Sequence, residues 1–199
     1  MNEIIRIKKE PFFGIHQLIA ELEEKIENTL LAGLNLTETE KVLIEDLLHF
    51  SLGAFQDKDH SDAYHPCTTA ELKQYTKYLC NTINQFLENT PGLSAWASVF
   101  ELTLRSPLIV VALRLNQSNE PGKTEILPGT DMQQVLKDIE AYTYRKHSES
   151  IYYRKFIRYY HGDTVYIVKP NEKRCWSRSM GLNDADEIVA EILNSSNGK

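Results

Sequence analysis

Residues 152–170 read YYRKFIRYYHGDTVYIVKP, and this stretch decides the fold. β-Branched and aromatic residues, which are enriched in strands, lie on both sides of Gly162. Glycine adopts a positive φ at no steric cost, so Gly162 can make the tight turn of a hairpin. Pairing about this turn places Tyr159 opposite Tyr166. The stretch therefore predicts two antiparallel strands.

The predicted pairing divides the hairpin into two faces, because side chains alternate across a strand. The face expected to pack on the core consists of Ile157, Tyr159, Tyr166 and Val168. The opposite face carries cations, aromatic rings and two aliphatic residues: Arg154, Phe156, Arg158, Tyr160, Val165, Ile167 and Lys169. A slip of one residue in the register would exchange the two faces.

The N-terminal part of the chain has apolar residues three and four positions apart, which is the spacing of amphipathic helices. A first helix is predicted over residues 12–31. A second begins at the capping box of Thr37 and Glu40, and a third begins at the capping box of Thr68 and Glu71. Three helices are therefore expected before any strand.

After the third helix the pattern changes to strands, with one more helix between them and one at the end. β-Branched and aromatic residues predict strands around residues 96–104 and 108–115. Residues 116–129 are rich in Asn, Ser, Pro and Gly, which predicts a loop. Helical spacing returns at residues 131–144, and Asn183 is the expected N-cap of a last helix.

These elements predict an α+β fold, with N-terminal helices followed by an antiparallel sheet of about four strands covered by helices. We expect a single domain over residues 1–199, with a helical part at about 1–90 and a sheet-containing part at about 91–199. Hydrophobic residues make up 42% of the chain and charged residues 25%, as in folded globular proteins.

The composition disfavours membrane and secreted proteins. No run of about 18 apolar residues is present, so no transmembrane helix is expected. The first residues of the chain lack the apolar stretch of a secretory signal. The cysteines, Cys67, Cys80 and Cys175, are widely spaced and odd in number, which argues against a disulfide framework. We therefore expect a soluble, cytoplasmic protein with no membrane partner.

Charge is distributed unevenly along the chain. The whole sequence has a net charge of −6. Residues 142–178 contain nine Lys or Arg against three acids, a net charge of +6, which leaves −12 for the remainder. The sequence therefore predicts one positive region on an acidic body.

The positive region combines cations, which bind phosphates, with flat rings, which stack on bases. The predicted nucleic-acid-binding residues are Arg154, Phe156, Arg158, Tyr160, Lys169, Lys173, Arg174, Trp176 and Arg178. Two alternatives stay open. The region could be an ordinary solvated surface whose cations balance the acidic body. It could also dock an acidic protein partner or a second copy of the chain.

One loop contains several potential metal ligands: Asp57, Asp59, His60, Asp62, His65 and Cys67. Their spacing matches no zinc motif. Their Asp-x-Asp-x-x-Asp order lacks the glycine and the glutamate that complete a calcium loop. The chain also lacks a glycine-rich phosphate loop and a Gly-x-Ser-x-Gly elbow. We therefore expect a polar loop, no metal, no cofactor and no enzymatic activity.

The C-terminal third contains the segments YIVKPN (166–171), RCWSRS (174–179) and NDADEI (183–188). They resemble C-terminal regions of bacterial restriction-modification and phage-defence proteins, the large adenine-specific DNA methyltransferases. The segment LTETE (36–40) is similar to a piece that follows their catalytic domains. The family's Asn/Asp-Pro-Pro-aromatic motif and its glycine-containing cofactor loop are absent. The resemblance therefore implies a DNA-facing accessory domain, with no catalytic residue carried over.

Overall fold

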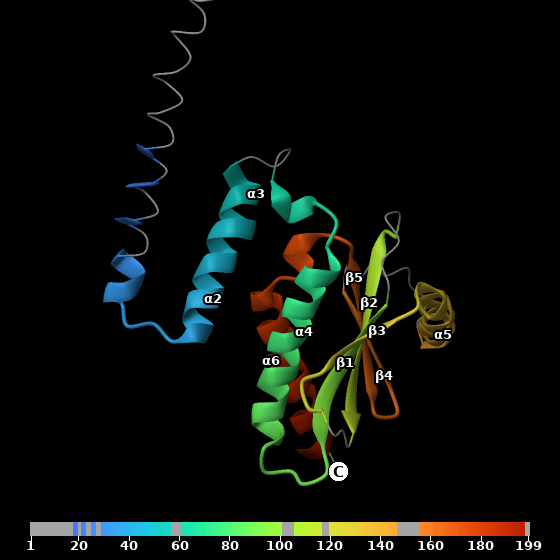
Figure 1. Cartoon of the computed structure of the whole chain (residues 1–199). Helices are drawn as coiled ribbons and strands as arrows, with labels where there is room; N and C mark the ends of the chain where they lie inside the picture. The colour runs from blue at the N-terminus through green and yellow to red at the C-terminus, as the bar shows by residue number, and fades with distance from the viewer. Residues whose placement is uncertain are drawn as a thin grey trace, which may run out of the picture. The chain divides into compact units, whose positions relative to one another are not determined.

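The computed structural model describes residues 18–19, 21–22, 25–26, 29–56, 61–100, 106–116, 120–146 and 156–197. Contacts between residues divide the chain into two compact units, Met1–Ile44 and Glu45–Lys199. Helix α2 (Glu38–Asp46) crosses the boundary between the units. The sheet and the helices that pack on it belong to the second unit (Figure 1).

In the first unit, the described residues between 18 and 33 are helical, in agreement with the predicted first helix. The turn that follows contains Asn35, whose φ is 54°. The capping box before α2 is confirmed. The Glu40 N–H donates to Thr37 Oγ1 over 3.3 Å, and the Thr37 N–H donates to Glu40 Oε2 over 2.8 Å. Both hydrogen bonds are local in sequence, which is why a short motif predicts them.

The second unit begins with the end of α2, which continues through a π-helix (Leu47–Leu52) into α3 (Gly53–Gln56). Helix α4 (Thr69–Leu87) follows. It starts at the predicted capping box of Thr68 and Glu71, in which both reciprocal hydrogen bonds are present. The starts of the second and third predicted helices are therefore confirmed.

In the described part of the chain the sheet has five strands in the order β3-β1-β2-β5-β4. The strands are β1 (Ser94–Phe100), β2 (Leu108–Asn116), β3 (Thr124–Leu127), β4 (Ile157–His161) and β5 (Thr164–Pro170). All neighbouring strands are antiparallel except β1 and β3, which run parallel. The α+β class is confirmed, whereas the expectation of a purely antiparallel sheet is corrected to a mixed sheet.

Strand β3 lies inside the segment 116–129, for which the sequence predicted a loop. Backbone hydrogen bonds attach this segment to β1: the Gly122 N–H donates to Ala95 O over 2.9 Å, and the Ala97 N–H donates to Lys123 O over 2.9 Å. The strand has only four residues between flanks rich in Pro and Gly. Pairing with β1, and not the local pattern, therefore decides its structure.

The predicted hairpin and its register are confirmed. Strands β4 and β5 pair with Tyr159 opposite Tyr166 and Ile157 opposite Val168. Gly162 makes the turn with a φ of 60°. Because the turn fixes the register, the division of the side chains between the two faces of the hairpin is also correct.

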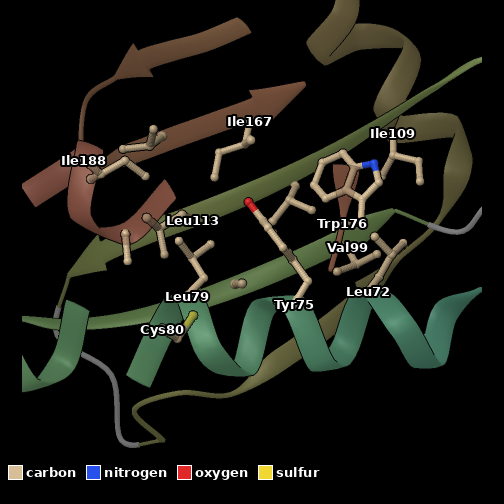
Figure 2. Close-up of a cluster of buried hydrophobic side chains, with 14 of the residues drawn as sticks. Leu72, Tyr75, Leu79, Cys80, Val99, Ile109, Leu113, Ile167, Trp176 and Ile188 are labelled. Atoms are coloured by element: carbon tan, nitrogen blue, oxygen red, sulfur yellow. The ribbon is translucent and has the colours of Figure 1, made fainter. Parts of the chain in front are cut away.

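Helices α4 and α6 (Arg178–Asn197) cover one face of the sheet and enclose the larger hydrophobic core (Figure 1). Figure 2 shows Tyr75 and Leu79 of α4 directed toward Leu113 and Ile167 of the strands. Ile188 of α6 belongs to the same core. Apolar residues that recur every three or four positions on α4 place one side of the helix against the sheet.

Helix α5 (Gly129–Lys146) lies on the opposite face of the sheet (Figure 1). Its residues Met132 and Ile139 pack in a smaller core with Val110 and Val168 of the strands. No helix in the described ranges is long and apolar enough to cross a membrane.

The expected N-cap Asn183 lies inside α6, which begins five residues before it. Two acceptors satisfy N–H groups of the first turn. Ser177 Oγ accepts from the Met180 N–H over 3.2 Å, and Asp46 Oδ2 accepts from the Ser179 N–H over 2.7 Å. The prediction of Asn183 as the N-cap is wrong, because the helix starts earlier, at the local Ser177 hydroxyl and at the Asp46 carboxylate, which lies 133 residues away and which no local motif reveals.

Candidate functional site

The residues predicted to bind nucleic acid do not form one exposed surface in the described part of the chain. Arg154 lies outside the described residues. Lys169 and Trp176 are buried, each with 1% of its surface exposed. Arg158 and Tyr160 contact carboxylates of α6 from the same sheet face. The expectation that this face is open is therefore corrected, because α6 covers it.

Lys169 is buried beside the carboxylate of Asp184, which belongs to α6. Its ammonium group also donates to the Cys175 carbonyl oxygen over 3.3 Å. Burial lowers the pKa of Lys169 because it disfavours the charged form, and the negative charge of Asp184 opposes this change. This ammonium group could contact a phosphate only by leaving its partner.

Three aromatic rings surround the Lys169 ammonium group. The ring centroids of Tyr75 and Phe156 lie 5.3 Å from its Nζ, and that of Trp176 lies 5.5 Å away. Each ring attracts the cation through its quadrupole. The Tyr75 hydroxyl donates to Asp184 over 2.5 Å, and Trp176 Nε1–H donates to a backbone carbonyl over 2.8 Å. We call Lys169, Asp184, Tyr75 and Trp176 the buried lysine cluster.

Two further carboxylates of α6 neutralise the outer end of the same sheet face. Arg158 forms ion pairs with Glu187 and, at 3.3 Å, with Glu191. The Tyr160 hydroxyl donates to Glu191. Burial and this hydrogen bond raise the pKa of Tyr160. Asp184, Glu187 and Glu191 are three and four residues apart and therefore lie along one side of α6.

Lys173 is paired with two carboxylates from other parts of the second unit. Its Nζ lies 2.9 Å from Asp62 Oδ2 and 3.0 Å from Glu71 Oε1. The hydrogen bond from Lys173 lowers the pKa of Asp62, and the same bond raises the pKa of Lys173. Asp62 also lies 3.0 Å from His65 Nδ1 and 3.6 Å from His49 Nε2.

Arg174 and Arg178 also have acidic partners. Arg174 Nε lies 2.7 Å from the Glu172 carboxylate. Arg178 lies 3.0 Å from Glu45 and 2.7 Å from Asp46. Every described cation of the predicted site is thus paired with a carboxylate, and a phosphate would compete with that carboxylate for the positive charge. The sequence shows the surplus of cations but not these pairs.

The loop with potential metal ligands is only partly described. Three of its members lie outside the described residues: Asp57, Asp59 and His60. Asp62 and His65 contact each other, and the Cys67 N–H donates to Asn171 Oδ1 over 2.8 Å. Within the described ranges, no group of three His, Cys, Asp or Glu side chains is arranged to hold a metal ion.

The cysteines are buried and unpaired by disulfides. Burial raises the pKa of Cys67 and of Cys80 to about 12. Since the thiolate is the nucleophile, both side chains stay unreactive thiols near neutral pH. The neighbouring His65 therefore does not make Cys67 an activated nucleophile.

We expect the thiol reagent DTNB, at a mildly alkaline pH, to modify none of Cys67, Cys80 and Cys175 in the native protein within minutes, and all of them after unfolding in guanidinium. The physical reason is burial, which excludes the reagent from all three thiols and raises the pKa of Cys67 and of Cys80. The measurement is the absorbance of the released thiolate. Rapid reaction of one equivalent in native protein would contradict the prediction.

Large apolar side chains are exposed along two helical segments. In the first unit the N-terminal stripe consists of Leu18, Ile19, Leu22, Ile26 and Leu30, which are 45–62% exposed. In the second unit the second stripe consists of Leu47, Leu48, Leu52 and Phe55, which are 37–89% exposed. The spacing in the sequence reveals each stripe. Only the structure shows that these side chains stay in contact with water.

Comparison of the chain with protein-family models finds no match. Neither a curated protein nor a solved structure matches the chain. A function for this protein therefore rests on the chemistry of its own surfaces.

Proposed function

We propose that the protein is a protein-interaction module that self-associates through the apolar stripes of its helices. The observation that supports this most is the second stripe, in which Phe55 is 89% exposed and Leu47 is 55% exposed. Burying one such side chain contributes about 1.5–3 kcal/mol, so monomeric proteins rarely leave a row of them in water. We therefore expect the exposed apolar side chains of the second stripe to be buried in an interface with a protein partner.

The backbone that carries the second stripe is anchored to the second unit. Asp46, immediately before the π-helix, is 4% exposed. Its carboxylate accepts hydrogen bonds from Arg178 over 2.7 Å and from the Ser179 N–H over 2.7 Å. The start of the stripe is therefore held in place while its apolar side chains face outward, which lowers the entropy cost of binding a partner.

The apolar side chains of the N-terminal stripe are also exposed, so binding of a partner would bury them. Its helix belongs to the first unit, and the five side chains of the stripe are each at least 45% exposed. Short helices are marginal in water unless one side is packed against something. A partner that buried this stripe would therefore also stabilise the helix.

We propose a second copy of the chain as the partner. Each copy brings the same apolar stripes, so two copies can cover each other in a symmetric interface. Docking of an acidic partner through the positive region of residues 142–178, called the basic segment below, has less support. The described cations of its predicted binding site are already paired with carboxylates.

Light scattering on the purified chain tests this proposal. We expect a dimer whose proportion does not fall when NaCl is raised from about 50 mM to about 500 mM, because apolar contacts are not screened by salt. Residues 18–34 contain four Glu and one Lys, so salt should even reduce repulsion between copies. A dimer that dissociates in salt would point to the basic segment instead. A monomer at every concentration would rule out self-association.

Replacing Leu52 and Phe55 with serine should weaken self-association about tenfold or more, since two apolar side chains leave the interface. The matched control is Leu193→Ser, because Leu193 is 46% exposed on α6 and belongs to neither stripe. Sedimentation measures the dissociation constants, and circular dichroism checks that each variant is folded. Equal weakening by the control would show that the second stripe is not the interface.

DNA binding by the basic segment, in an accessory domain of a bacterial restriction-modification or defence system, stays a prediction. It is supported by the charge distribution of the sequence and by the resemblance of the C-terminal segments. Its test is duplex binding by the Arg158→Ala, Arg174→Ala variant at two salt concentrations. Unchanged affinity would remove these residues from the predicted site.

A further inference from the structure

Strand β4 lies at one edge of the sheet, with β5 as its only neighbouring strand in the described part of the chain (Figure 1). Its register with β5 runs without a bulge from Ile157 to His161, and the strand contains no proline. Bulges and prolines are two of the devices that protect an edge from pairing with another chain. At the opposite edge, β3 has only four residues and is followed by Pro128. Of the two edges, β4 is therefore the better template for a further strand.

One hydrogen bond of the hairpin shows which backbone groups of β4 face away from the sheet. The Leu115 N–H of β2 donates to Asp163 O over 2.8 Å. Backbone groups alternate in direction along a strand, so those of Asp163 and of every second residue after it face β2. Those of the residues in between, such as Tyr166, face β4. Tyr159 lies opposite Tyr166, so its backbone groups face β5.

The N–H and C=O groups of Arg158 and Tyr160, on either side of Tyr159, therefore point outward from the edge. Within the described ranges these backbone groups form no hydrogen bond. Tyr160 is 43% exposed, so water reaches this part of the edge. Donors and acceptors that point outward at alternate residues are what an extended chain needs in order to pair as an added strand.

On the side of β4 that faces α6, negative charges outnumber positive ones. Arg158 and Lys169 of the hairpin lie beside three carboxylates of α6, which are those of Asp184, Glu187 and Glu191. This group carries one negative charge in excess when all its members are ionised. Asp184 is buried, whereas the Glu187 and Glu191 side chains are 60% and 46% exposed. A cation on an added strand would therefore find a carboxylate at this edge.

The side chains of Ile157, Tyr159 and His161 point to the other face of the sheet, which carries α5. Ile157 and Tyr159 pack against the smaller core, and His161 is exposed. An added strand would place every second side chain beside these residues, since residues directly opposite each other share one face. Apolar side chains at those positions would pack next to the smaller core.

We propose that β4 binds an extended segment of another protein as an added strand, and that this segment alternates apolar residues with Lys or Arg. The outward backbone groups of Arg158 and Tyr160 hold its backbone. Its apolar side chains lie on the same face as Tyr159, and its cations meet Glu187 and Glu191. Backbone pairing supplies the affinity, and the alternating side chains supply the specificity. This site is separate from the apolar stripes and does not depend on self-association.

Fluorescence anisotropy with labelled peptides tests the proposal on the whole chain. The probe is a peptide of about seven residues that alternates valine and arginine, has blocked ends and is long enough to span β4. A second probe has glutamate in place of each arginine. We expect the arginine peptide to bind about tenfold more tightly or better, because the carboxylates of α6 attract its cations and repel the glutamates of the second probe. The difference should decrease as NaCl is raised.

The Tyr160→Pro variant tests the backbone pairing. Proline lacks the N–H, and its ring occupies space beside the edge, so the variant should bind the arginine peptide about tenfold more weakly or worse. The substitution removes no hydrogen bond of the sheet, because this N–H points outward. Tyr160→Ala is the matched control. It loses the same side chain but keeps the N–H, so it should retain most of the affinity.

Three results would overturn the proposal: binding of neither peptide, tighter binding of the glutamate peptide, or equal loss of affinity in Tyr160→Pro and Tyr160→Ala. Binding of neither peptide, together with a dimer that Tyr160→Pro dissociates, would assign β4 to contacts between copies of the chain. Thermal unfolding shows whether each variant is folded. If Tyr160→Pro is unfolded, an arginine peptide that is N-methylated along its backbone gives the same test on the wild type, and it should not bind.

Discussion

Replacing Asp184 with alanine is expected to lower the free energy of unfolding by about 3–5 kcal/mol, the usual cost of leaving a buried charge without its partner. Lys169 is 1% exposed, and its ammonium group is paired with the Asp184 carboxylate. The same carboxylate accepts the hydrogen bond of the buried Tyr75 hydroxyl. The substitution therefore removes the partner of two buried polar groups at once.

Urea unfolding measures this loss, and Asp186→Ala is the matched control. Asp186 is an exposed acid on the same helix, so its replacement should change the stability by about 0.5 kcal/mol or less. The double variant Lys169→Met, Asp184→Leu should recover the part of the loss that comes from the unpaired Lys169 charge, because apolar residues replace both charges, whereas the buried Tyr75 hydroxyl still lacks its acceptor. A loss no larger than that of Asp186→Ala would show that the ion pair does not form.

The free energy of unfolding of the Asp184→Ala variant should also depend more strongly on pH than that of the wild type. Burial already lowers the pKa of Lys169 in the folded state, and Asp184 opposes this change. Without Asp184 the folded pKa falls further below the unfolded value, so the unfolded state binds more protons between the two values. Between the folded and the unfolded pKa of Lys169, the stability of the variant therefore rises with pH. The stability that the variant loses relative to the wild type should be largest near neutral pH and should decrease toward pH ~10.

Replacing Gly181 with alanine is expected to destabilise the protein by about 1–3 kcal/mol through overpacking. A Cβ atom at this position of α6 would lie 2.6 Å from the Tyr75 carbonyl oxygen and 3.3 Å from the Leu79 nitrogen of α4. These are backbone atoms, so the clash is relieved only if the two helices move apart. Glycine is therefore required by the close approach of α6 to α4.

The expected effect of Gly181→Ala has the opposite sign to that of an ordinary Gly→Ala substitution in a helix. Alanine is the better helix former by about 1 kcal/mol, so Gly→Ala in an uncrowded helix stabilises. Gly53→Ala in α3 is the control, because its Cβ would meet only the Ser61 hydroxyl at 3.7 Å. Thermal unfolding should show a lower midpoint temperature than the wild type for Gly181→Ala but not for Gly53→Ala. A stabilised Gly181→Ala variant would mean that α4 and α6 pack less closely.

Local sequence motifs predicted the parts of the fold that depend on neighbouring residues. The capping boxes of Thr37 and Thr68 join residues three positions apart, and both are confirmed. Gly162 fixes the register of the hairpin through its own turn. Strand β3 could not be predicted in this way, because its hydrogen bonds run to a strand about 27 residues earlier in the chain.

The candidate site also divides into features that the local sequence predicts and features that only the tertiary structure decides. By itself the sequence determined the starts of the second and third predicted helices, the hairpin register, the surplus of cations in residues 142–178 and the spacing of the apolar stripes. Only the tertiary structure decided which of these features face water. It placed α6 over Lys169 and Arg158 and paired both with carboxylates, while it left Phe55 89% exposed. The reason is that burial and ion pairing depend on segments far apart in the chain, about which a local pattern carries no information.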